Sequence, residues 1–279
     1  MHTRGDGRLA LLHLWPLEHG RRGRSGRPVP PAHCGAPARP RAARPPVSFP
    51  VRLVLFDVDG TILSARGAGR RAFAAALMEV YGTAGDIERY DLRGATDQRI
   101  VFELMEGAGL SRDGVRERLD DCFEAYARGL HAEIGDGRGV VVMPGIADLV
   151  QRLDGEKAAL VGLLTGNIEA GARIKLTPTG LWPYFQLGAY GSDHHDRRQL
   201  PSLAARRAQA LVGRGFRPEE ILVIGDTPRD IECARHFGAV AVAVATGQYS
   251  RAELEAEGPD LLFEDFSDVE AALAKFLSR

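Results

Sequence analysis

The chain has 279 residues, 44% of them hydrophobic and 26% charged, which is enough for about two domains. Its 36 basic and 37 acidic residues nearly balance, and this balance argues against a protein dedicated to nucleic acid. No apolar run approaches the roughly 18 residues that a membrane-spanning helix needs. We therefore expect neither a nucleic-acid partner nor a membrane.

The first fifty residues differ from the rest in charge and composition. They contain nine arginines, no lysine and two acidic residues, a formal charge of +7 that leaves −8 for residues 51–279. Proline, glycine, alanine and arginine dominate residues 21–50 and leave no periodic apolar pattern to bury. We expect a disordered basic segment over residues 1–50, whose function stays open, and an acidic folded body after it.

The three cysteines, Cys34, Cys122 and Cys233, are far apart and form no Cys-x-x-Cys motif. Their number and spacing favour neither a disulfide framework nor a zinc site. Reduced thiols of this kind are typical of a cytoplasmic protein.

Buried strands alternate with helices after residue 50. Residues 52–56 are apolar without polar alternation, as in a strand that is buried on both faces of a parallel sheet. The same pattern recurs at residues 158–164, 187–190, 221–224 and 240–244, with a weaker strand at 261–263. Helical patterns lie between them: from Asn167, as the helix cap, to about residue 177, over 201–213 and 228–238, and from residue 268. This alternation predicts an α/β fold, a doubly wound Rossmann-like parallel sheet.

One interval interrupts the alternation. Between about residues 64 and 140 no buried strand is expected, and helical periods fill residues 68–81, 97–109 and 112–131. We interpret residues 65–140 as an inserted, all-helical cap and residues 51–64 and 141–279 as the α/β core. An insertion after the first strand lies near the strand ends where α/β sheets bind ligands.

Polar residues follow three of the predicted strands. Asp57 and Asp59 follow the first, Thr165 the second and Asp226 the fourth, with Asp230 shortly after. Because the carboxyl ends of parallel strands meet at one edge of a sheet, we expect these side chains to share a crevice. The carboxylates would repel one another without a cation, and hard oxygen ligands without His or Cys favour Mg²⁺ over zinc.

The crevice carries the groups that phosphoryl transfer needs. A carboxylate beside Mg²⁺ can attack phosphorus to form an aspartyl phosphate, which divides hydrolysis into two easier steps. A second carboxyl two residues later can protonate the leaving oxygen and then activate water. Thr165 and the backbone N–H groups of Gly166 and Asn167 can donate to the phosphoryl oxygens.

These motifs resemble the signatures of the haloacid dehalogenase superfamily. Asp57-Val58-Asp59-Gly60-Thr61 is similar to the first signature, Thr165 after its strand to the second, and Gly225-Asp226 through Asp230 to the fourth. The resemblance covers about residues 51–279, and three motifs in the right order at strand ends are far more specific than any one of them.

The resemblance implies a role for each acidic residue. Asp57 would be the nucleophile and Asp59 the general acid/base, a residue that phosphatases and phosphomutases of the superfamily have and dehalogenating members do not need. Mg²⁺ would be held by Asp57, the main-chain carbonyl of Asp59 and Asp226. Asp230 would support the metal site or a neighbouring lysine.

The helical insertion is similar to the C1 cap of the superfamily. Gly94-Ala95-Thr96-Asp97 within it and Pro144-Gly145-Ile146 after it are similar to phosphoglycolate-phosphatase-like members. Arg93, Thr96 and Asp97 could reach a substrate, although Thr96 and Asp97 equally suit the start of a helix at Gln98.

The sequence departs from the superfamily at the third signature, which is usually a lysine in or near Lys-Pro. Arg198, followed by Gln199-Leu200-Pro201, occupies the matching register, whereas Lys175 lies in the helix after Thr165. The catalytic cation is therefore either Lys175 or Arg198.

Together these features predict a Mg²⁺-dependent phosphatase that hydrolyses a small phosphorylated metabolite through an aspartyl phosphate on Asp57. A phosphomutase of the β-phosphoglucomutase type is the alternative within the enzyme class. A phospho-accepting signalling domain is the alternative from another class, although it needs neither Asp59 nor a helical cap.

Overall fold

The computed structural model describes residues 52–278, which lie within one compact unit of the chain. The predicted disordered segment, residues 1–50, lies outside the described residues. Within residues 52–278, no helix combines the length and the apolar character needed to cross a membrane.

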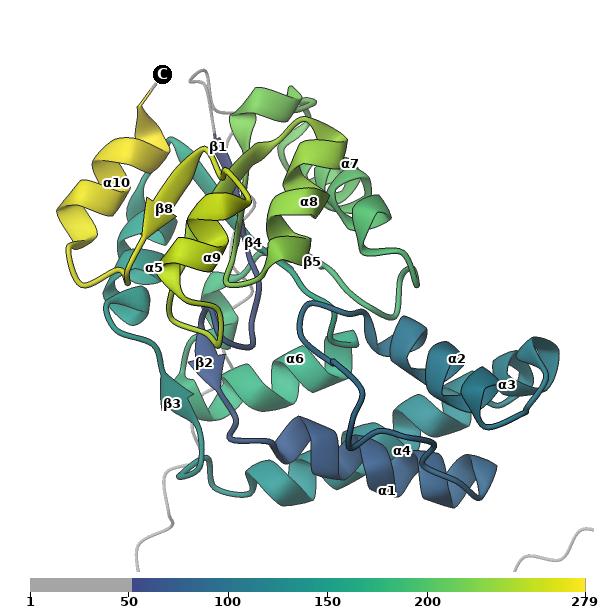
Figure 1. Ribbon diagram of the computed structural model, residues 1–279. Coiled ribbons are helices and arrows are strands. Elements are labelled where there is room, and N and C mark those ends of the chain that lie inside the picture. Colours follow the sequence, from purple (N-terminus) through teal and green to yellow (C-terminus); the bar gives the residue numbers. More distant parts are fainter. Residues whose placement is uncertain (1–51, 279) are drawn as a thin grey trace, which may run out of the picture. The chain divides into compact units, whose positions relative to one another are not determined.

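A six-stranded parallel sheet forms the centre of the described unit (Figure 1). Its spatial order is β5-β4-β1-β6-β7-β8, so that β4 and β6 flank β1. The predicted α/β fold and all six predicted strands are confirmed. The strands are β1 (Arg52–Phe56), β4 (Ala159–Leu164), β5 (Leu187–Ala189), β6 (Ile221–Gly225), β7 (Val240–Val244) and β8 (Leu261–Phe263).

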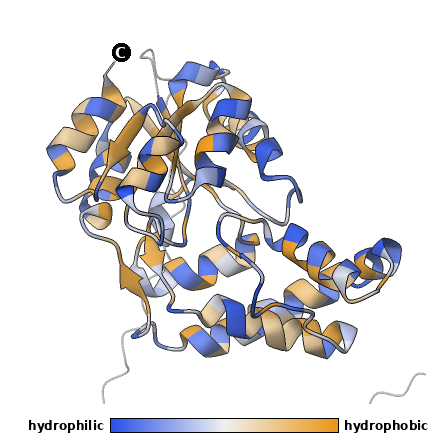
Figure 2. Ribbon diagram, viewed as in Figure 1, coloured by the Kyte–Doolittle hydropathy of each residue, from blue (hydrophilic) through white to orange (hydrophobic). Residues whose placement is uncertain are grey.

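Helices cover both faces of the sheet. α5 (Ile146–Gly155) and α10 (Val269–Leu277) pack on one face, and α7 (Leu200–Val212), α8 (Pro228–Phe237) and α9 (Arg251–Ala256) pack on the other (Figure 1). Along β1, Val54 and Phe56 join one apolar cluster while Leu53 and Leu55 join the other. Burial on both faces explains why the strand sequences lack polar alternation. In Figure 2 the strands are coloured mainly as hydrophobic, whereas the helices around them carry both kinds of residue.

A helical insertion separates β1 from β4. The chain leaves the core through β2 (Leu63–Ser64) and returns through β3 (Val141–Val142), and these two strands pair antiparallel. Between them lie α1 (Ala68–Tyr81), α2 (Asp97–Gly107), α3 (Arg112–Glu117) and α4 (Leu119–Ile134). The expected cap boundaries at residues 65 and 140 stay a prediction.

The insertion also packs on a helix that follows a core strand. α1 and α4 pack closely, with the rings of Phe73 and Tyr126 4.3 Å apart. α6 (Glu169–Leu176) follows β4 but lies against α4, and its buried Ala172 and Leu176 share the apolar cluster of the insertion. This short helix therefore connects the two halves of the fold.

Four local features differ from the sequence-based expectation. The helix expected over residues 112–131 is interrupted at Arg118, where α3 ends and α4 begins. Helices α5 and α9 were not expected. The two short strands β2 and β3 were also not expected. Finally, α6 begins at Glu169 with Ile168 at its N-cap position, so Asn167 does not cap it.

Candidate active site

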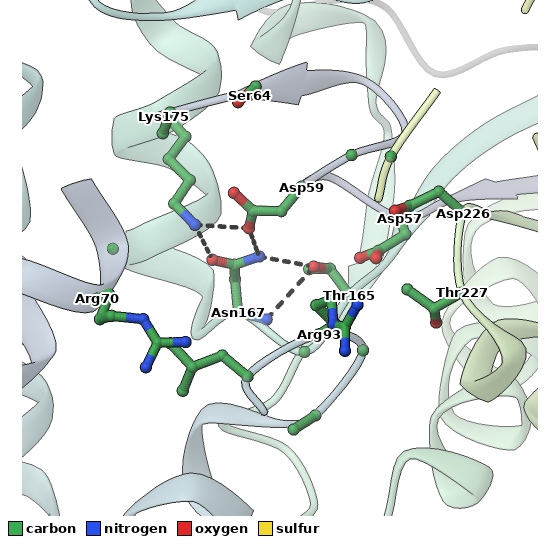
Figure 3. Close-up of a pocket in the computed structure, with 18 of the residues that line it drawn as sticks. Asp57, Asp59, Ser64, Arg70, Arg93, Thr165, Asn167, Lys175, Asp226 and Thr227 are labelled. Atoms are coloured by element: carbon green, nitrogen blue, oxygen red, sulfur yellow. Dashed lines mark hydrogen bonds and ion pairs between the residues drawn. The ribbon is translucent and has the colours of Figure 1, made fainter. Parts of the chain in front are cut away.

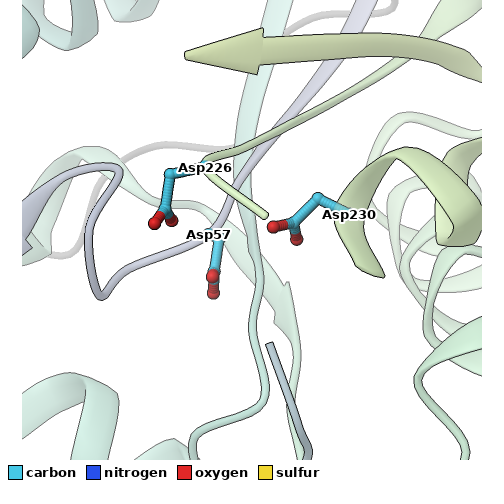
Figure 4. Close-up of side chains that lie close together, drawn as sticks. All are labelled: Asp57, Asp226 and Asp230. Atoms are coloured by element: carbon cyan, nitrogen blue, oxygen red, sulfur yellow. The ribbon is translucent and has the colours of Figure 1, made fainter. Parts of the chain in front are cut away.

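Three neighbouring strands bring the predicted acidic residues to one edge of the sheet. Asp57 follows β1, Thr165 follows β4 and Asp226 follows β6, the two strands on either side of β1. Carboxylate oxygens of Asp57, Asp226 and Asp230 lie within 4.8 Å of one another, and all three residues are buried (Figure 4). We call these three residues the acidic cluster.

The turn after β1 holds Asp226 at close range. Gly60 has a φ of +83°, and a Cβ built on it would lie 2.2 Å from Oδ2 of Asp226. The Thr61 hydroxyl donates to Oδ1 of the same carboxylate at 3.0 Å. Glycine at position 60 thus allows both the left-handed turn and the close approach of Asp226.

Burial and mutual repulsion perturb the acidic cluster. Burial raises the pKa of Asp57 to about 6; Arg197 opposes this shift and Asp230 adds to it. Burial also raises the pKa of Asp226 well above its usual range, and the charges of Asp230 and Asp57 raise it further. Positive charge at this position would keep the carboxylates ionised.

Arg197 supplies part of that charge. Its guanidinium lies 2.6 Å from Oδ1 of Asp230 and 3.3 Å from Oδ1 of Asp57, and its side chain is 7% exposed. It also donates to the carbonyl oxygens of Leu164 and Gly94, both at 3.3 Å. Although burial lowers the pKa of Arg197, the two carboxylates raise it by more, so the side chain stays charged.

The structure places the expected Arg198 elsewhere. Its guanidinium bonds to Asp196, and 48% of its side chain is exposed. Arg197 and Arg198 belong to a short 3₁₀ helix, in which successive side chains point in different directions. Arg198 was one of the two expected cations, but it is the adjacent Arg197 that reaches Asp57.

Lys175 forms an ion pair with Asp59, the second carboxylate in the loop after β1. Its ammonium lies 2.6 Å from Oδ2 of Asp59 and 2.6 Å from the side-chain oxygen of Asn167 (Figure 3). The amide nitrogen of Asn167 donates to Oδ2 of Asp59 at 2.8 Å and to the hydroxyl oxygen of Thr165 at 2.9 Å. Lys175 is buried, whereas 45% of the Asp59 side chain is exposed, which leaves this carboxyl accessible from the cavity.

Thr165 links the two carboxylates. Its oxygen accepts hydrogen bonds from the side chain and, at 3.3 Å, from the backbone N–H of Asn167. Its own hydroxyl hydrogen is therefore directed to Asp57, a bond that lowers the pKa of that carboxyl. A Cβ on the neighbouring Gly166 would lie 1.9 Å from the carbonyl oxygen of Ala95, so only glycine fits there.

A cavity of about 380 Å³ opens between these residues and the insertion. The core side of its wall includes Asp57, Asp59, Thr165 and Asp226. The insertion contributes apolar and cationic side chains, and Arg70 and Arg93 are labelled in Figure 3. These insertion residues include Arg66, Arg70, Phe73, Arg93, Ile100 and Tyr126.

Comparison with known proteins places the chain in a family. The model of the family described as haloacid dehalogenase-like hydrolase matches residues 54–235. The chain belongs to this family. The family expected from the sequence motifs is thus confirmed, and residues 54–235 span β1 to α8, including the insertion and the acidic cluster.

Relatives within the haloacid dehalogenase-like family carry phosphatase names. A phosphoglycolate phosphatase of Synechococcus elongatus is 29% identical over 81% of this chain and 99% of its own length. The pyrophosphatase PpaX of Anoxybacillus flavithermus is 26% identical over 78% of this chain and 95% of its own. These names agree with the phosphatase activity expected from the sequence.

Solved structures share the fold. A hydrolase from Pseudomonas syringae aligns with a TM-score of 0.58 at 24% identity, over 81% of this chain and all of its own. CbbY from Rhodobacter sphaeroides, determined in complex with phosphate, aligns with a TM-score of 0.55 at 20% identity, over 78% and 96% of the two chains.

The acidic cluster is chemically suited to a divalent cation. Its ligands are hard carboxylate oxygens, and their charges lie close together in a buried place. Both oxygens of Asp230 are already bonded, one to Arg197 and the other to Thr227. Asp57 and Asp226 therefore have the freer oxygens, and Asp230 holds Arg197 beside Asp57.

Proposed function

We propose that the protein is a Mg²⁺-dependent phosphatase that hydrolyses a small phosphorylated metabolite through an aspartyl phosphate on Asp57. The observation that carries the proposal is the meeting of Asp57, Asp59, Thr165 and Asp226 at one wall of a single cavity. Membership of a hydrolase family with relatives named as phosphatases supports it.

The first step transfers the phosphoryl group to the protein. A carboxylate oxygen of Asp57 attacks phosphorus as the ester P–O bond breaks, and the departing oxygen takes a proton from Asp59. Oδ2 of Asp59 is bonded to Lys175 and Asn167, so Oδ1 is the oxygen that holds this proton. Mg²⁺, held by Asp57, Asp226 and the main-chain carbonyl of Asp59, would stabilise negative charge on the transferring group.

The second step releases inorganic phosphate. Asp59, now ionised, takes a proton from water, whose oxygen attacks phosphorus and breaks the bond to Asp57. Lys175, 2.6 Å from Oδ2 of Asp59, holds this carboxyl in place through both steps. The N–H of Gly166 is a donor that we assign to the phosphoryl oxygens, and the Thr165 hydroxyl becomes a second one when its hydrogen turns from Asp57 to the phosphoryl group.

The size and charge of the cavity favour a small substrate with a second anionic group. The guanidinium of Arg66 has no polar partner among residues 52–278, and Arg70 uses two of its nitrogens on the carbonyls of Ile87 and Tyr90. Phosphoglycolate and pyrophosphate, which appear in the names of the relatives, are both of this kind. We further propose a cytoplasmic location, consistent with the free, buried thiols of Cys122 and Cys233.

Release of inorganic phosphate tests the function. The purified protein with Mg²⁺ is assayed against a panel of phosphate esters that includes phosphoglycolate and ethyl phosphate, which lacks the carboxylate, with D57N as control. Release by the wild type, lost on chelation of Mg²⁺ and in D57N, supports the proposal. Sugar-phosphate isomerisation without release would indicate a phosphomutase, and a stable phosphoprotein without turnover would indicate a signalling domain.

A further inference from the structure

The loop after β4 is held by a residue of the insertion. One carboxylate oxygen of Asp97, in the first turn of α2, accepts a hydrogen bond from the backbone N–H of Ile168 at 2.7 Å. The backbone N–H of Asp97 donates to the carbonyl oxygen of Gly166, also at 2.7 Å. Asp97 therefore forms one hydrogen bond to the residue before Asn167 and one to the residue after it.

The Asp97 carboxylate provides a hydrogen-bond acceptor for the first turn of α6 that the helix itself lacks. The first N–H groups of a helix have no partner within it, and a nearby Ser, Thr, Asp or Asn usually accepts from one of them. Ile168, at the N-cap position of α6, offers no such side chain. Asp97, 71 residues earlier in the chain, supplies the acceptor at this end of the helix.

Asn167 is thereby released from capping. Its amide instead bonds to Asp59, Thr165 and Lys175. Lys175 lies near the other end of α6, so both groups that hold Oδ2 of Asp59 come from this short segment. The position of the segment therefore determines the position of both.

We propose that Asp97 is a positioning residue for the general acid/base: by fixing residues 166–168 it places Asn167 and Lys175 against Asp59. This inference rests on the proposed function and deepens it. The role requires a hydrogen-bond acceptor at position 97 and does not require charge. Burial agrees with this reading, since it raises the pKa of Asp97 to about 7 against the opposing charge of Lys175 and so disfavours a fixed negative charge there.

The test compares substrates that differ in their need for a general acid. Phenyl and p-nitrophenyl phosphate share the reacting group, but p-nitrophenolate leaves readily without a proton. We expect D97A to lower kcat/KM for phenyl phosphate by about tenfold or more, part of what a general acid contributes. For p-nitrophenyl phosphate the loss should be threefold or less, on the order of one hydrogen bond. D97N, which keeps an acceptor, should restore the wild-type ratio between the two substrates.

T96V is the control for a lost contact between the insertion and the core, although it also removes the hydroxyl that accepts from the backbone N–H of Arg99 at the start of α2. The Thr96 hydroxyl also joins the insertion to the core, by donating to the carbonyl oxygen of His195 at 2.6 Å, but it does not touch the loop after β4. T96V should change both substrates equally. Equal losses in D97A for both substrates, or a rise in KM with kcat unchanged, would overturn the proposal, since the second pattern indicates direct contact with substrate.

A second variant covers the case in which D97A does not fold. D97S keeps a residue suited to a helix start but is too short to reach Ile168, and it should show the same selective loss. If D97N folds and both D97A and D97S do not, Asp97 is needed for the fold and the positioning role is refuted. If the wild type hydrolyses no phosphate ester, the proposed function fails, an outcome distinct from every variant result.

Discussion

The two carboxylates after β1 are two residues apart in the chain but belong to differently built surroundings. Asp57 faces a nucleophile half, made of Asp226, Asp230 and Arg197, which all come from the core. Asp59 faces an acid/base half, made of Asn167 and Lys175, whose supporting helix is held by the insertion. The side chains of the first half all come from the core, with one hydrogen bond from Arg197 to Gly94 of the insertion. The second half depends on the two hydrogen bonds between Asp97 of the insertion and the loop after β4.

The largest effect should come from the nucleophile half. D57N removes the group that receives the phosphoryl group, so kcat should fall at least about 10⁴-fold for every ester, whatever its leaving group. Steady-state phosphate release with phenyl and p-nitrophenyl phosphate measures this. D136N, the same substitution at an exposed aspartate, is the control. Substantial turnover by D57N would place the nucleophile elsewhere.

Removal of Arg197 should mainly cost stability. R197A leaves Asp57 and Asp230 without their buried partner, a change that typically costs about 3–5 kcal/mol. R198A breaks surface ion pairs with Asp196 and Glu232 and should cost about 1 kcal/mol or less. Urea denaturation in EDTA compares the two variants, and equal losses would contradict the assignment of Arg197.

In the acid/base half, K175A should reduce turnover selectively. It removes the cation 2.6 Å from Asp59, and we expect a loss of about 10–100-fold with phenyl phosphate, smaller with p-nitrophenyl phosphate. R198A should keep kcat within about twofold, because its side chain does not line the cavity of Asp57. A larger loss in R198A than in K175A would make Arg198 the catalytic cation.

The smallest effect concerns pH and metal. A carboxyl whose pKa is raised on folding binds more protons in the folded than in the unfolded state, so stability falls as pH rises between the two pKa values. Asp57, raised from 3.8 to about 6, should cost the metal-free protein about 2 kcal/mol between pH 4 and pH 7. Denaturation in EDTA at pH 4 and pH 7 measures this loss. Mg²⁺ should reduce the difference, and a stability that is flat with pH in EDTA would argue against crowded carboxylates.

The sequence predicted the nucleophile half more fully than the acid/base half. Asp57, Thr165 and Asp226 follow buried apolar strands, and the parallel order of those strands brings their ends together. Arg197 was missed by one position, because the direction of each side chain in a 3₁₀ turn depends on local backbone geometry. Asn167 was expected to cap a helix, a local rule that Asp97 overrides from 71 residues away.

Two unexpected helices did have sequence signals. Ser250 and Glu253 form a capping box at the start of α9. The buried residues of α5, Ile146, Leu149, Val150 and Leu153, follow the helical period. The interruption at Arg118 has no comparable signal, since both α3 and α4 lie in one helix-compatible run.

The bonds between α2 and the core also limit how the insertion can move. Three hydrogen bonds cross this boundary. The backbone N–H of Asp97 donates to the core, the Asp97 carboxylate accepts from the core, and the Thr96 hydroxyl donates to the core. A swing of the insertion that parts α2 from the core must break all three, at about 1 kcal/mol each. Fewer than about one molecule in a hundred would then be open on that side at any moment, so α2 and the core keep a single arrangement in nearly all molecules.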